Sequence, residues 1–186
     1  MKLKKLNAAL GLLSVLFMLA HIGYSIYAYL TFYYNPLLNQ ITAIPFMVLS
    51  CLHAVCGMLV VFTQADGTRM DLYPKMNLRT ILQRVSAALI LPLLILHINT
   101  FSLMKASAEK GQIVFIILLM IAELLFFAAV LIHVAVSLTR GLITLGLLSD
   151  IRIQKNLDRV IYAVCAVLYA ASVFGVLKGQ AAMFFG

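Results

Sequence analysis

The chain has 186 residues, of which 64% are hydrophobic and 11% are charged, with a formal net charge of +8 and a mean hydropathy of +1.07. A soluble domain is about 45–50% apolar and about 25% charged, so this composition excludes an ordinary soluble domain and a disordered chain. A membrane β-barrel would alternate polar and apolar residues in short segments, and a nucleic-acid-binding protein would gather its basic residues in one patch. We therefore expect transmembrane helices and no nucleic-acid partner.

Five apolar runs are each long enough to cross a bilayer, which takes roughly 20 helical residues. They cover residues 6–30, 41–64, 80–104, 112–140 and 157–177. The first run is longer than the apolar core of a signal peptide, which is about 7–15 residues, so we interpret it as a retained helix. The sequence predicts an all-α membrane protein that forms a single domain, residues 1–186, surrounded by membrane lipid.

Lysine and arginine residues gather at alternate ends of the predicted helices. Eleven lie in the N-terminal segment and in segments 65–84 and 140–159, and three lie in the other connections and the C-terminal tail. Cytoplasmic segments carry the excess of positive charge, so we expect a cytoplasmic N-terminus and a C-terminus outside. Both long segments are predicted to be polar loops, and loops of this length often form interaction surfaces, with solvated connectors as the alternative.

The chain has four histidines, and one lies in each of the first four predicted helices. Ionisable side chains inside a membrane are costly and usually functional. At 1.5 Å per residue, His21 and His97 lie roughly 22 and 25 Å from the inner face, whereas His53 and His133 lie roughly 16 and 10 Å from it. Each pair belongs to helices that run in the same direction, which are diagonal partners when four helices form a bundle in chain order.

Two diagonal histidines at one depth can bind a flat macrocycle from its two faces. All four histidines lie on the small or polar stripe of their helix, which should face the bundle interior. Neither pair resembles a zinc or di-iron site, since no carboxylate or cysteine completes the ligand set beside the two histidines. The pattern predicts that the first four helices bind two haem b groups, with His21 and His97 on the outer iron and His53 and His133 on the inner iron.

Glu123 is the only acidic residue in the interior of a predicted span. It lies roughly 17 Å from the outer end of its helix, at the level of the outer haem. Ten residues separate it from His133, which places it about 80° away, at the edge of the stripe that faces the bundle. A buried carboxyl group suits proton transfer coupled to quinone chemistry. We expect Glu123 to serve a quinone site or to conduct protons, with a packing role between helices as the alternative.

The order of one histidine in each of the first four spans resembles the single-chain, five-helix, two-haem cytochrome b subunit of succinate dehydrogenases and quinol:fumarate reductases. The stretch Gln83-Arg84-Val85-Ser86, followed by His97, is similar to the family's Arg-x-Ser/Thr-Gly stretch before a haem-ligating histidine, with Ala87 in place of the glycine. Arg140 follows His133 as an arginine does in many members, but a few residues later. The resemblance implies that Arg84, Ser86 and Arg140 lie at the haems; topology and docking charge are the alternative for the arginines.

By this resemblance, the chain is a membrane anchor in a bacterial cytoplasmic (inner) membrane. It would pass electrons between a cytoplasmic iron–sulfur subunit and a membrane quinone, commonly menaquinone. Succinate and fumarate would interconvert on a flavoprotein subunit, since nothing on this chain suggests dicarboxylate chemistry. Two alternatives remain open. One is the cytochrome b subunit of another respiratory oxidoreductase, and the other is a haem-free anchor or transporter whose histidines relay protons.

Overall fold

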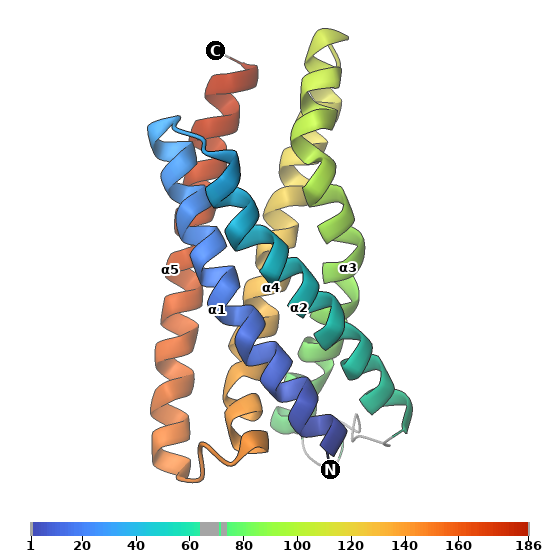
Figure 1. Ribbon diagram of the computed structural model, residues 1–186, viewed down its shortest axis with the longest axis vertical. Helices are drawn as coiled ribbons and strands as arrows, with labels where there is room; N and C mark the ends of the chain where they lie inside the picture. Colours follow the sequence, from blue (N-terminus) through green and yellow to red (C-terminus); the bar gives the residue numbers. More distant parts are fainter. Residues whose placement is uncertain (1, 64–70, 72–73, 186) are drawn as a thin grey trace.

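The computed structural model describes residues 2–63, 71 and 74–185, and within this part every secondary-structure element is an α-helix (Figure 1). The helices are α1 (Lys2–Thr31), α2 (Pro36–Thr63), α3 (Pro74–Glu109), α4 (Ile113–Leu145) and α5 (Ile151–Phe184). All five are long and apolar enough to cross a membrane. The prediction of an all-α chain with five helices of membrane-spanning length is confirmed.

The link between α4 and α5 is much shorter than the predicted polar loop at 140–159, so that prediction is wrong. Only residues 146–150 separate the two helices. Gly146 ends α4 with a left-handed φ of 79°, a conformation that favours glycine. Asp150 caps α5 by accepting hydrogen bonds from the backbone N–H groups of Arg152 at 2.6 Å and Ile153 at 2.9 Å. Hydropathy underestimated both helices because Arg140 and Thr144 lie near the end of α4 and the first turns of α5 carry charged residues.

The other predicted docking segment, 65–84, is helical from Pro74 onward. Residues 64–70 and 72–73 lie outside the described residues, so the structure does not address a docking loop there. α3 therefore extends about one and a half turns beyond its apolar run, at 3.6 residues per turn. This places Lys75 and Arg79 on a helix rather than in a connection.

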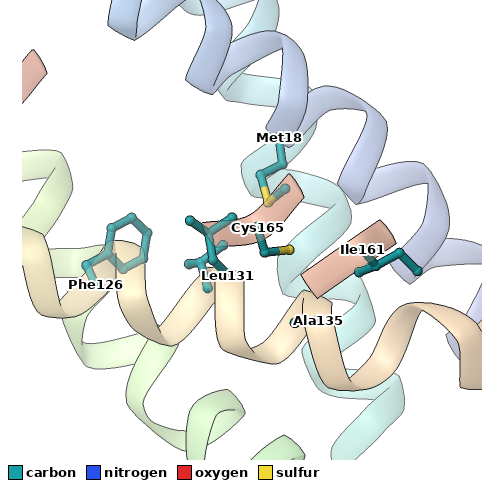
Figure 2. Packing of buried hydrophobic residues seen from close by; sticks show 7 residues of the cluster. Met18, Phe126, Leu131, Ala135, Ile161 and Cys165 are labelled. Carbon is teal, nitrogen blue, oxygen red and sulfur yellow. The ribbon is translucent and has the colours of Figure 1, made fainter. Parts of the chain in front are cut away.

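The helices pack as two hairpins, α1 along α2 and α3 along α4. α4 joins the hairpins through its contact with α1, and it also packs against α5. Figure 1 shows the two termini at opposite ends of the molecule. The first four helices do not form the core alone. Met18, Phe126 and Leu131 pack in one buried cluster with Ile161 and Cys165 of α5 (Figure 2). The fifth helix is therefore part of the bundle that surrounds the histidines.

Burial differs sharply between the helices. α2 has no buried residue, whereas α4 carries the largest set of buried residues of the five helices. Many large apolar side chains on the outer faces are exposed. Such a surface would aggregate in water but matches the hydrocarbon region of a bilayer. The arrangement supports a multi-pass membrane protein with α4 at its centre.

Candidate cofactor-binding site

The inner pair of histidines is brought together by α2 and α4. The ring centroids of His53 and His133 are 6.1 Å apart, and the ring planes meet at 71°. A metal–imidazole bond is about 2.0–2.1 Å and the bonded nitrogen lies about 1.2 Å from the ring centre, so two imidazoles on opposite sides of one metal have centroids about 6.4 Å apart. The observed spacing fits a single metal between the two rings.

Hydrogen bonds assign the tautomer of both inner histidines. His53 Nδ1 lies 2.9 Å from the backbone carbonyl oxygen of Asn7, and His133 Nδ1 lies 3.0 Å from that of Gln83. A carbonyl oxygen only accepts, so Nδ1 is the protonated nitrogen in each ring. The lone pair is then left on Nε2, which is the atom free to bind a metal.

Two residues that the resemblance placed at the haems lie around His133. The hydroxyl of Ser86 donates to its own helix at Leu82, and its oxygen lies 3.2 Å from His133 Nδ1, where it can accept. Arg140 donates to the side-chain oxygen of Gln83 at 3.1 Å. It also donates to the Thr80 hydroxyl at 3.0 Å and the Met76 carbonyl at 3.1 Å. Arg140 thus binds α3 at the residue whose carbonyl orients His133. Arg84, which also lies on α3, is half-buried.

The outer pair faces a cavity of about 660 Å³ that is lined by residues of all five helices, including His21 and His97. Small-molecule and cofactor pockets are typically about 300–1,000 Å³. The ring of His97 stacks on Phe126 with centroids 4.7 Å apart, and His21 stacks on Phe46 at 6.3 Å. The structure therefore brings His21 and His97 to one largely apolar cavity, as their depths predicted.

The hydrogen bonds of the outer histidines allow the same tautomer as that of the inner ones. His97 Nδ1 lies 3.0 Å from the Glu123 carboxylate, which accepts. His21 Nδ1 lies 3.3 Å from the Thr42 hydroxyl, whose hydrogen is already donated to carbonyl oxygens one turn back in α2. Within the described part of the chain, Nε2 of none of the four rings has a hydrogen-bond partner.

This pattern is typical of metal-binding histidines, which donate their other ring N–H to a carboxylate or carbonyl. The described residues contain no group of three or more histidine, cysteine or acidic side chains that could hold a metal ion by themselves. Two imidazoles per site leave the remaining positions to be filled by the ligand itself, as a macrocycle does. Haem ligation by the four histidines stays a prediction, and the side chains present fit it.

The tyrosines of α1 and its link to α2 occupy two different environments. Tyr24, Tyr29 and Tyr34 line the cavity. Tyr27 and Tyr33 are exposed and pack edge to face, with centroids 6.4 Å apart. The second pair suits the headgroup region of a membrane.

Sequence reasoning missed the residues that orient the imidazoles. Two of the acceptors are backbone carbonyls, which leave no signal in the sequence. Gly11 packs against the ring of His53, where an added Cβ would lie 3.0 Å from Cε1. Gln180 of α5 donates to Glu123, although the fifth predicted span was assigned no role at the site. Of these, only the polar Gln180 within an apolar segment could have been noticed.

No family model, no curated protein and no solved structure matches this chain. The histidine pairs and the cavity are therefore the basis for the function proposed below.

Proposed function

We propose that this chain is a dihaem cytochrome b membrane anchor of the succinate dehydrogenase or quinol:fumarate reductase type. In this proposal it carries electrons between a cytoplasmic iron–sulfur subunit and a membrane quinone, with menaquinone as the expected species. The observation that carries the proposal is that the rings of His53 and His133 lie 6.1 Å apart, His21 and His97 line one cavity, and Nδ1 of each of the four rings lies within hydrogen-bond distance of an oxygen.

His53 and His133 would hold one haem b, and His21 and His97 the other. Each bound haem supplies an iron that takes up and releases one electron. The protein fixes the imidazoles through their Nδ1 hydrogen bonds and surrounds them with apolar side chains such as Phe126. With two histidines for each haem, oxygen would find no open position on the iron, which would suit electron transfer.

The outer cavity also supports a quinone-reacting role. Glu123 lines it with His21 and His97 and is 4% exposed, so its carboxyl group is shielded from bulk water. A buried carboxyl beside an electron carrier can exchange the proton that accompanies quinone reduction. In the proposed assembly, the iron–sulfur and flavoprotein subunits lie on the cytoplasmic side of a bacterial inner membrane, and dicarboxylate chemistry takes place on the flavoprotein.

A haem-free proton relay fits the inner pair less well. A relay passes protons between groups that can both accept and donate them. His53 and His133 donate to backbone carbonyl oxygens, which do not release a proton onward. The inner histidines are therefore held as fixed ligands rather than linked as carriers.

The test is to purify the chain in detergent and to record a reduced-minus-oxidised spectrum and a pyridine haemochrome assay. We expect haem b at about two groups per chain, since two histidines ligate each iron. A preparation from haem-replete cells without a haem b spectrum would contradict the proposal and favour a haem-free anchor. Identification of a co-purifying flavoprotein or molybdenum subunit separates this family from other respiratory cytochromes b.

A further inference from the structure

A chain of polar side chains continues from His97 through three other helices. Glu123 of α4 uses both carboxylate oxygens: Oε1 faces His97 Nδ1 at 3.0 Å, and Oε2 accepts from Gln180 Nε2 of α5 at 2.5 Å. The same Nε2 donates to the hydroxyl of Tyr29 of α1 at 3.3 Å. Glu123 is 4% exposed and Gln180 is 1% exposed. His97 is thus linked to α1 and α5 through one buried carboxylate.

The close approach of α1 and α5 makes this chain possible. A Cβ at Gly179 would lie 2.2 Å from Tyr29 Cδ1, and one at Gly175 would lie 3.8 Å from Tyr29 Cβ. Small residues four apart on a transmembrane helix allow such contact. Gly179 leaves room for the Tyr29 ring, and the neighbouring residue Gln180 meets the Tyr29 hydroxyl.

We propose that Gln180, supported by Tyr29, is a positioning residue for the outer haem site that acts through Glu123 on His97. This inference rests on the proposed dihaem function. A carboxylate held at one oxygen only can turn about its last side-chain bond, because that torsion is broad. Gln180 holds the second oxygen, so the first stays directed at His97 Nδ1. The imidazole is then fixed in one orientation with its Nε2 presented to the cavity.

The hydrogen bond between His97 Nδ1 and Glu123 also sets how strongly His97 Nε2 would donate electrons to a bound iron. A carboxylate that accepts from Nδ1–H makes the opposite nitrogen a more basic ligand. A more basic ligand stabilises the oxidised, more positive iron. The inner histidines have no counterpart, since His53 and His133 donate to neutral carbonyl groups. Loss of the Gln180 contact is therefore expected to affect the outer haem and to spare the inner one.

The test variant is Gln180→Leu, which keeps a side chain of similar size and removes the amide. We expect both haems to be bound after purification, the outer haem's midpoint potential to rise, and its low-spin ferric EPR signal to broaden. Partners of metal ligands typically contribute about 10–100-fold to metal affinity, so transfer of the outer haem to an apoprotein acceptor should be about 10-fold faster. The inner haem serves as an internal reference.

Asn99→Leu is the matched control. Asn99 lies two residues from His97, but it is exposed and its amide donates to the Ile95 carbonyl of its own helix at 2.7 Å. We expect no change in either haem signal. An outer haem of wild-type potential, EPR signal and transfer rate in Gln180→Leu would overturn the inference and leave the dihaem function intact. A wild-type protein without haem would instead refute the function itself.

If Gln180→Leu does not assemble, Glu123→Gln is the second test variant. It keeps the size of the side chain but replaces the carboxylate with a neutral amide, so the same rise in outer-haem potential is expected. An unchanged outer-haem potential and EPR signal in Glu123→Gln would overturn the inference as well. Tyr29→Phe keeps the ring against Gly179 and removes only the hydroxyl, so it should cause a smaller shift in the same direction.

Discussion

The four histidines differ in what accepts from their Nδ1 atoms: two backbone carbonyls for the inner pair, and a hydroxyl and a carboxylate for the outer pair. The acceptor fixes the tautomer, and the tautomer decides which nitrogen can bind a metal. Single-residue variants at the inner and outer sites should therefore affect different haems.

The first residue-level prediction concerns the inner pair. His53→Ala removes one of the two imidazoles that face each other at 6.1 Å, so we expect loss of the inner haem with retention of the outer one. Haem content and the EPR spectrum of the purified variant measure this. Loss of the outer signal with an intact inner signal would show that the pairing is wrong.

The second residue-level prediction concerns Gly11, which packs against the His53 ring. In Gly11→Ala the new methyl group would lie 3.0 Å from Cε1 and 3.1 Å from Nδ1, so the ring has to move although its Nδ1 is bound to Asn7. We expect weaker retention of the inner haem, measured as its rate of transfer to an apoprotein acceptor.

Gly23→Ala is the control for this variant, because Gly23 also lies within α1 but has nothing within 4 Å of its added Cβ. Alanine favours a helix over glycine by about 1 kcal/mol, so Gly23→Ala should retain both haems and leave the fold at least as stable. Equal haem retention in the two variants would argue against a tight Gly11–His53 contact.

At the level of the helices, a polar cluster joins α3, α4 and α5. Arg79 donates to both oxygens of Asp158, at 3.0 and 2.8 Å, and to the carbonyl of Val136 at 2.8 Å. Thr139 donates to Asp158 at 2.7 Å and is fully buried. A bidentate pair with further hydrogen bonds holds its geometry better than an isolated surface ion pair. The cluster fixes α5 against the α3–α4 hairpin.

We expect Asp158→Asn to lower the free energy of unfolding by about 1–3 kcal/mol, because the variant leaves Arg79 without its charged acceptor. Unfolding in detergent, followed by circular dichroism, measures the change. Arg159→Gln is the control, since Arg159 is exposed and donates to the side-chain oxygen of Asn156 at a long 3.3 Å. The control should stay within about 0.5 kcal/mol of wild type. Equal effects would show that the cluster adds no stability.

For the molecule as a whole, five helices place the two termini at opposite ends (Figure 1). The distribution of lysine and arginine predicts that the N-terminal end is cytoplasmic. This orientation puts the inner histidines toward the proposed iron–sulfur partner and the outer cavity toward the other face of the membrane.

Cysteine labelling tests the orientation. In a variant without Cys51, Cys56 and Cys165, Lys4→Cys should react with a membrane-impermeant maleimide only in inverted vesicles, and Ala182→Cys only in intact cells. Both positions are exposed. If both cysteines reacted from the same side of the membrane, the chain could not cross it five times. The reverse pattern would place the inner histidines at the outer face.

The sequence by itself determined the number of helices and the depth of each histidine. Both follow from local rules: an apolar run of roughly 20 residues spans a bilayer, and a helix rises by a constant amount per residue. The depths predicted His21 with His97 and His53 with His133, and the structure places the first two at one cavity and the rings of the second two 6.1 Å apart. The same local rules failed at polar helix ends, which is why residues 140–145 and 151–159 were taken for loop.

Only the tertiary structure decided what holds the histidines. Asn7 and Gln83 act through backbone carbonyls, which every residue has, so no pattern could have marked them. Gln180 meets Glu123 across 57 residues of sequence. Arg140, which the resemblance placed at a haem, donates to the Gln83 side chain and its neighbours on α3. These contacts depend on how far each helix is rotated and how closely it approaches the next. Packing of all five helices sets both quantities together, and hydropathy and spacing along one helix do not contain them.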